Sequence, residues 1–320
     1  MAVGVPKPKP IPKNLSLEEQ QQLVFHPEKN PTRYVAFEHA TDYPFEPKAA
    51  TWSRVNAWWL ADASWLSYTQ EAETVKAIFR DRAGLPSCEL IARDGTECYL
   101  AHGADFAIAA FRGTQPDDWN DVLDDVMFQS VAWDEGHVHR GFARGLDVVR
   151  EPLGQALKAL PAHCRVWFTG HSLGAALATL AAYRYRDVAA GVYTFGSPLV
   201  GNGVFAGRFD SVFEERSLRY VNDHDAVTHV PPEPFALPHG LYTHVDHLRW
   251  ITKDGQIATT PPTLAHFVRD VFGRSNALLD IVGLHLADAR ISLPAALADH
   301  TPLYYGLHCW NDFALHVPAS

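Results

Sequence analysis

Residues 168–175 read FTGHSLGA, and this stretch constrains the fold more than any other part of the sequence. Glycine weakens the interior of a strand, so Gly170 and Gly174 indicate a tight turn after the apolar run that precedes them. The two glycines flank Ser172 in the pattern G-x-S-x-G. Between a strand and a helix, this pattern is typical of a sharp turn that exposes a nucleophilic serine. The alternative is a glycine-rich turn in which Ser172 only caps the following helix.

The segments around this turn alternate between strand and helix patterns. Two strands are expected on either side of an Asp94-Gly95 turn, and an apolar strand then ends near Gly113. Further strands are expected at CRVWFTG, GVYTFGSP and SLRYVND. Helices are expected between them, which predicts an α/β fold with a mostly parallel central sheet and helices on both faces.

Three helical segments carry particular expectations. The first, TWSRVNAWWLADASWLSYT, has one apolar face that Asp62 interrupts, and its tryptophans are expected to pack in the core rather than stack on a ligand. The second covers residues 140–160, where Pro152 should kink the helix or start a new segment. The third is SLGAALATLAAYRYRD, directly after the glycine turn.

Composition limits the class of protein. The chain has 320 residues, 47% of them hydrophobic, and a formal net charge of -10, so one large core is expected and no nucleic-acid partner is indicated. No apolar run reaches the roughly 18 residues of a transmembrane helix. Residues 1–15 are expected to form a mobile arm rich in proline and lysine, and residues 16–320 a single domain.

The N-terminal sequence MAVGVPKPKPIPK lacks the apolar core of a signal peptide. The four cysteines have no ligand spacing, and a two-residue turn would pair position 91 with Cys98, so Cys88 and Cys98 are not opposed. Free cysteines favour a cytoplasmic location, although export without a leader stays open. The segment HVDH at 244–247 has no third ligand at a suitable spacing, so packing is expected there rather than a metal site.

A nucleophilic serine needs a base, and the base needs a carboxylate that orients it. In sheets of this class the chain order is serine, then acid, then histidine. The segment VNDHDAVTHVPP offers both Asp223 and Asp225 as the acid. His300 precedes Pro302, which disfavours helix at the residue before it, so His300 is expected on a loop. Spacing alone does not separate His300 from the other histidines of the chain.

Five stretches in this order resemble the class 3 lipases, the fungal-type triacylglycerol lipase family with an α/β-hydrolase core. They are FRGT at 111–114, VHRGF at 138–142, GHSLGA at 170–175, VNDHDAVTHVPP at 221–232 and LADHTPLYYG at 297–306. The weaker segment VNAWWLADASWLSYT looks like an N-terminal helix of bacterial members of the family.

The resemblance implies a serine carboxylester hydrolase with Ser172, His300 and Asp225 as its triad. Asp223 fits the family motif less well and is expected to be a solvated charge. The N–H groups of Leu173 and Thr114 are expected to bind the oxyanion, and no metal or cofactor is expected. The implied substrate is a lipid or lipid-like ester, in solution or at a lipid–water interface. A phospholipase A1, a short-chain esterase and a non-catalytic lipid-binding protein remain alternatives.

Two apolar segments are candidates for the roof over Ser172. Residues 115–127 are acidic with one apolar side, which fits an amphipathic lid, although a fixed turn is equally compatible with the pattern. Residues 262–290 form a long apolar insertion between Asp225 and His300, which could instead pack in the core. The acidic run favours a fixed roof over Ser172 and short or medium acyl chains.

Overall fold

A computed structural model describes residues 6–12, 19, 34–113, 130–223, 225–229, 240–245, 247–260 and 298–317. Its helices are α2 (Arg54–Leu66), α3 (Ala72–Asp81), α5 (Arg140–Ala159), α6 (Leu173–Arg184), α7 (Gly203–Phe213) and α10 (Pro302–His316), with 3₁₀ turns η3 (Glu214–Arg216), η4 (Ala226–His229) and η6 (Ala298–His300). Its strands are β1 (Ser87–Arg93), β2 (Thr96–His102), β3 (Phe106–Phe111), β4 (Ser130–Ala132), β5 (His137–His139), β6 (Arg165–His171), β7 (Ala189–Phe195), β8 (Gly201–Asn202), β9 (Ser217–Asn222), β10 (Tyr242–Thr243), β11 (His247–Ile251) and β12 (Ile257–Ala258).

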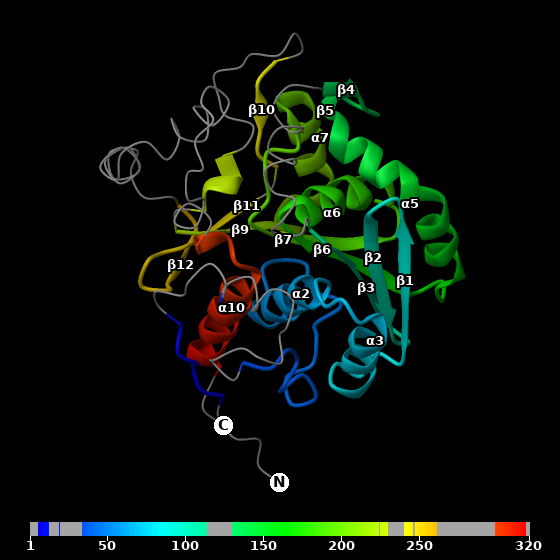
Figure 1. The fold of residues 1–320 in the computed structure, drawn as a ribbon. Coiled ribbons are helices and arrows are strands. Elements are labelled where there is room, and N and C mark those ends of the chain that lie inside the picture. The colour runs from blue at the N-terminus through cyan, green and yellow to red at the C-terminus, as the bar shows by residue number, and fades with distance from the viewer. Residues whose placement is uncertain are drawn as a thin grey trace.

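The main sheet has the strand order β1-β2-β3-β6-β7-β9-β11-β12 (Figure 1). The central pairs β3–β6, β6–β7, β7–β9 and β9–β11 are parallel. The edge pairs β1–β2, β2–β3 and β11–β12 are antiparallel. A smaller sheet has the order β10-β8-β5-β4. The predicted α/β fold with a mostly parallel central sheet is therefore confirmed.

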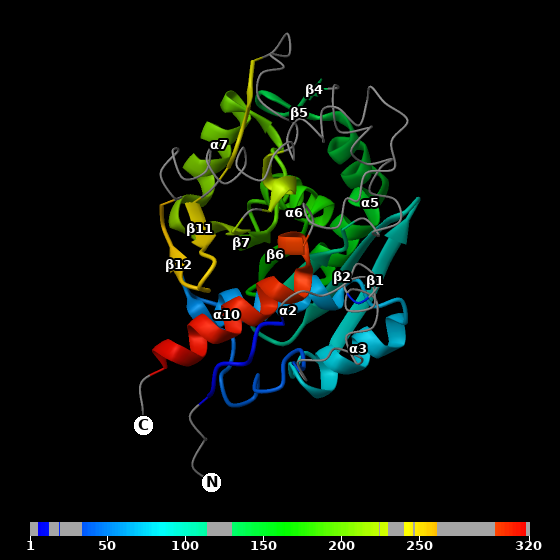
Figure 2. The same cartoon turned by 60° about the vertical axis from the view of Figure 1, so that its left-hand side comes forward.

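Helices cover both faces of the main sheet. In Figures 1 and 2, α2 and α10 lie below the sheet, and α5 and α6 lie above it. One buried cluster joins α2, α3 and α10 to the sheet, and a second joins α5, α6 and α7 to its other face. Trp58, Trp59 and Trp65 of α2 are at most 2% exposed, so these tryptophans are core residues as expected.

The β1–β2 hairpin has the predicted register. Cys98 pairs with Ile91, and Cys88 pairs with Ala101. Asp94 and Gly95 both have positive φ, as a two-residue hairpin turn requires. The two cysteines are free.

Pro152 does not divide the second predicted helix, because α5 runs without interruption from Arg140 to Ala159. The apolar face continues through the proline, with Val149 and Leu153 both buried against the core. Packing on the sheet therefore holds both halves of the helix in one element, although proline removes a backbone hydrogen bond there.

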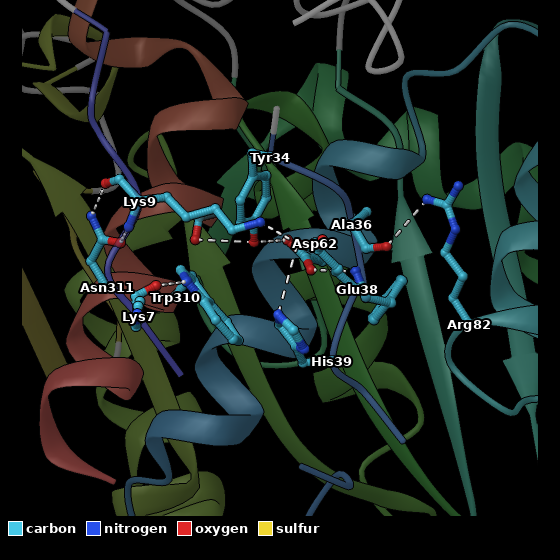
Figure 3. Close-up of polar contacts among 12 residues, drawn as sticks. Lys7, Lys9, Tyr34, Ala36, Glu38, His39, Asp62, Arg82, Trp310 and Asn311 are labelled. Carbon is cyan, nitrogen blue, oxygen red and sulfur yellow. Dashed lines mark hydrogen bonds and ion pairs between the residues drawn. The ribbon is translucent and has the colours of Figure 1, made fainter. Parts of the chain in front are cut away.

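The described part of the N-terminal arm lies along α10 (Figure 3). The Lys7 carbonyl accepts a 3.0 Å hydrogen bond from Nε1 of Trp310. Asn311 bonds both the N–H of Lys9, at 2.6 Å, and its carbonyl, at 2.8 Å. The ammonium of Lys9 also pairs with Glu38. Residues 6–12 thus have specific backbone contacts, whereas the mobility of residues 1–15 and the single domain over 16–320 stay predictions.

Candidate active site

Ser172 forms a sharp turn between β6 and α6. Its φ of 62° and ψ of −130° lie in a backbone region that residues other than glycine rarely adopt. Its N–H donates a 2.9 Å hydrogen bond to the carbonyl of Phe195 at the end of β7. Ser172 makes no side-chain hydrogen bond that caps α6, so the capping alternative does not describe this serine. A strained backbone at such a position is typical of functional sites.

The two glycines of the pattern allow the backbones of neighbouring elements to come into contact. A Cβ on Gly170 would lie 2.2 Å from the carbonyl oxygen of Gly174. A Cβ on Gly174 would lie 2.3 Å from the carbonyl oxygen of Phe111. Strand β6, helix α6 and the end of β3 therefore meet closely around Ser172, which is why the sequence has glycine at both positions.

Asp225 and His300 form a buried pair. Nδ1 of His300 lies 2.8 Å and 2.7 Å from the two carboxylate oxygens of Asp225, and the side chains are 4% and 0% exposed. The N–H of Val227 donates to Oδ1 of Asp225 at 3.0 Å, and the hydroxyl of Tyr305 donates to Oδ2 at 2.5 Å. These bonds fix the carboxylate and orient the imidazole, which is what a triad requires of its acid.

The structure brings Asp225, and not Asp223, to His300. Asp223 follows β9 with a positive φ of 39°, and its N–H donates to the carbonyl of Ile251. The negative charge of Asp223 raises the pKa of His308 in α10 and so offsets part of the lowering that burial causes. His300 ends the 3₁₀ turn η6, immediately before α10, rather than lying on an irregular loop.

Gly196 connects the serine turn to the His300–Asp225 pair. It follows Phe195, whose carbonyl holds the N–H of Ser172. Its φ is +59°, and a Cβ there would lie 2.8 Å from Oδ2 of Asp225 and 2.9 Å from Nδ1 of His300. All three predicted triad residues thus gather at the carboxyl ends of β6, β7 and β9, the side of a parallel sheet where ligands bind. Figure 2 shows the start of α10 beside the end of β6 and the start of α6.

The two predicted oxyanion donors differ in what the structure describes. Leu173 is the first residue of α6, so its N–H is one of the donors that a helix leaves unbonded at its N-terminus. Thr114 lies outside the described residues, as do both roof candidates, 115–127 and 262–290. Arg112, just before them, is held to β2 by a bond from its N–H to the Glu97 carbonyl and by a 2.8 Å ion pair with the Glu97 side chain.

Sequence reasoning missed three side chains around the His300–Asp225 pair. Tyr305 bonds Asp225, His171 lies beside His300, and Tyr68 bonds His171. The position of Tyr305 was a usable signal in the sequence. It lies in the first turn of the helix that follows His300, so its closeness to His300 could have been expected. For Tyr68 the sequence holds no local signal, since it lies 103 positions from His171.

Part of the chain around this site matches a known protein family. Residues 108–235 match the family model described as lipase (class 3). This region is therefore similar to the class 3 lipases. It contains Ser172 and Asp225, whereas His300 lies beyond it.

The chain is similar, over part of its length, to fungal and plant enzymes. It is 36% identical over 107 residues to a secreted mono- and diacylglycerol lipase of Malassezia restricta, covering 32% of this chain and 31% of that protein. It is 40% identical over 91 residues to a chloroplastic phospholipase A(1) of Arabidopsis thaliana, covering 27% of this chain and 20% of that protein. The chain thus spans a third or less of the length of these relatives.

The fold is similar to that of a fungal lipase solved with an inhibitor. The TM-score is 0.51 at 22% sequence identity, and the match covers 79% of this chain and 94% of that one. Within the described residues, no helix is long and apolar enough to cross a membrane.

Proposed function

We propose that this protein is a serine carboxylester hydrolase that acts on acylglycerols or similar lipid esters. The observation that carries the proposal is the buried bond between His300 Nδ1 and Asp225, at the same strand ends as the strained turn of Ser172. The match of residues 108–235 to the class 3 lipase family model supports it. All three triad positions are filled, which argues against a non-catalytic lipid-binding protein.

The reaction follows from the roles of the three side chains. Ser172 Oγ attacks the ester carbonyl while His300 takes its proton, and Asp225 stabilises the imidazolium that forms. The negative oxygen of the intermediate is bound by the N–H groups of Leu173 and Thr114, and each such donor is typically worth about 3–4 kcal/mol. His300 then protonates the leaving alcohol. Water next attacks the acyl group on Ser172, with His300 again as the base, and the carboxylic acid product is released.

The leaving group and acyl chain define the alternatives. A phospholipase A1 is the second candidate, because one of the similar plant proteins is a phospholipase A(1). A short-chain esterase is the third, if the roof over Ser172 is fixed. In that case rates should saturate smoothly with monomeric ester, whereas a mobile amphipathic lid should give a jump in rate at the solubility limit.

Two narrower expectations stay predictions. Membership of a bacterial-type branch rests on the segment VNAWWLADASWLSYT alone. A cytoplasmic location is supported by the four free cysteines.

The function is tested with wild type, Ser172→Ala and Ser64→Ala, a control at a buried serine of α2. We expect wild type and Ser64→Ala to react with a fluorophosphonate and to hydrolyse p-nitrophenyl esters, and Ser172→Ala to do neither. Ser172→Ala should keep the wild-type circular dichroism, because alanine fits the same turn. Labelling of Ser172→Ala would contradict the assignment. A panel of diacylglycerol, triacylglycerol and phosphatidylcholine then separates the lipase from the phospholipase.

A further inference from the structure

The imidazole of His171 lies against the imidazole of His300. His171 ends β6 and immediately precedes Ser172. The two ring centroids are 4.3 Å apart, with 40° between the ring planes, and His171 is 1% exposed. A movement of the His171 ring would therefore displace the imidazole that we propose as the base.

Tyr68 holds the other side of the His171 ring. Its hydroxyl lies 2.9 Å from Nδ1 of His171. The backbone N–H of Gly113 donates a hydrogen bond to the same hydroxyl. A Cβ on Gly113 would lie 2.0 Å from that hydroxyl, so the backbone just before Thr114 is in direct contact with Tyr68. One phenol thus joins the proposed oxyanion loop to the histidine beside the proposed base.

The protonation states of this pair follow from burial. Burial and, after it, the charge of His300 hold the pKa of His171 well below its usual value, so the ring is neutral at neutral pH. Burial raises the pKa of Tyr68, so the phenol keeps its proton. The phenol and the neutral imidazole therefore share one hydrogen bond through Nδ1 of His171, and the phenol also donates to the His171 carbonyl at 3.4 Å.

The His171 ring also interacts with the backbone of His300. Nε2 of His171 makes no hydrogen bond of normal geometry with the described residues. The main-chain carbonyl of His300 nevertheless acts on the ring as an acceptor and partly offsets the fall in the pKa of His171. The polar contacts thus run from Gly113 through Tyr68 and His171 to the backbone of His300.

We propose that Tyr68 and His171 form a positioning pair for His300, an inference that rests on the triad proposed above. The pair supports one face of the His300 imidazole while Asp225 holds its Nδ1, so the ring keeps its orientation as it takes the proton of Ser172. Because His171 stays neutral, no second positive charge stands beside the His300 imidazolium. The bond from Gly113 also joins the pair to the backbone that follows β3.

The test compares Tyr68→Phe with Tyr193→Phe. Each removes one buried hydroxyl, and that of Tyr193 bonds the backbone N–H of Ser53 instead. We expect Tyr68→Phe to lower kcat about tenfold, the rate equivalent of one hydrogen bond, with KM changed by less than about twofold. Tyr193→Phe should leave both constants at the wild-type values. Equal kcat values for the two variants would overturn the proposal.

A double-mutant cycle with His171→Phe shows whether the pair acts as a unit. Phenylalanine keeps a ring against His300 but cannot form a hydrogen bond with Tyr68. If the two side chains act together, Tyr68→Phe should cost almost nothing further in the His171→Phe background. Independent losses that multiply would contradict a joint role.

An NMR comparison decides the positioning role without turnover. The proton between His300 Nδ1 and Asp225 should give a resolved signal in wild type. We expect Tyr68→Phe to shift or broaden this signal and Tyr193→Phe to leave it unchanged. An unchanged signal in Tyr68→Phe would overturn the positioning pair. Turnover that survives Ser172→Ala would overturn the proposed function instead, so the two failures are distinct.

Discussion

The phenol of Tyr305 donates a 2.5 Å hydrogen bond to Oδ2 of Asp225, the carboxylate oxygen that lies 2.7 Å from Nδ1 of His300. The N–H of Asn222 donates to the same phenol at 3.1 Å. Burial and the nearby Asp225 charge raise the pKa of Tyr305 well above its usual value, so the phenol remains a donor. Helix α10 therefore supplies a fixed partner to the acid of the proposed triad.

We expect Tyr305→Phe to lower kcat by roughly 10- to 100-fold, because a hydrogen bond to a charged group contributes about 1.5–3 kcal/mol. KM should stay close to wild type, since the phenol contacts Asp225 and not the ester. Steady-state kinetics on a soluble p-nitrophenyl ester measure the effect, with the neighbouring Tyr304→Phe as control. A change confined to KM would show that Tyr305 contacts substrate instead.

Asp225→Asn should lower kcat by about 10⁴, as loss of the orienting carboxylate does in triads. Asp223→Asn should change kcat by less than about twofold, since Asp223 lies in the turn after β9 and Asp225 makes the bond to His300. The same ester assay compares the two variants at equal concentrations of folded protein. The opposite order of severity would make Asp223 the acid.

Gly196→Ala should lower both stability and kcat. Its positive φ and its contacts with Asp225 and His300 leave no room for a Cβ. Gly84→Ala is the matched control, because Gly84 also has positive φ, at +68°, but a Cβ there meets nothing within 4 Å. Both variants should lose about 1 kcal/mol or more of unfolding free energy, and only Gly196→Ala should lose kcat. Normal kcat in a folded Gly196→Ala would show that the site tolerates the clash.

Asp62 predicts how stability changes with pH. It is buried in α2, accepts from Tyr34 at 2.5 Å and from the Phe37 N–H at 2.8 Å, and burial raises its pKa to about 7. In the unfolded chain its pKa is about 3.9. Between these values the folded state binds more protons than the unfolded state, so this group lowers stability as pH rises from about 4 to about 7.

Asp62→Asn should remove this contribution, and the exposed Asp187→Asn should not. The measurement is the unfolding free energy in urea at pH 4.5, 5.5, 6.5 and 7.5. We expect the stability of Asp62→Asn relative to wild type to increase steadily with pH. A constant difference across this range would mean that Asp62 is ionised in the folded protein throughout.

Local pattern predicted much of the fold. The β1–β2 register follows from a two-residue turn, and the serine turn follows from the spacing of two glycines, because both depend on neighbouring residues. In the sequence, Asp62 stood out only as a polar residue that interrupts the apolar face of a helix, and its hydrogen-bond partner could not be predicted. Its partner Tyr34 lies 28 positions away, beyond the reach of helical periodicity.

The support around the base was less accessible to sequence reasoning. Tyr68 and His171 meet because α2 packs across the end of β6, and that contact depends on the whole arrangement of layers. Pro152 also shows that local sequence preference does not determine the structure alone. Its local preference would divide α5, but the buried face of the helix on the sheet overrides that preference.

The packing of α10 on α2 has a consequence for how the protein is made. A ribosome produces α2, Ser172 and Asp225 before it produces His300, which immediately precedes α10. Helix α10 must return to α2, which is made much earlier, and long-range contacts of this kind form slowly. A nascent chain can therefore complete its sheet and its serine turn while it still lacks the histidine that we propose as the proton acceptor. Under the proposed function, such a chain would stay inactive toward lipid esters until α10 has docked.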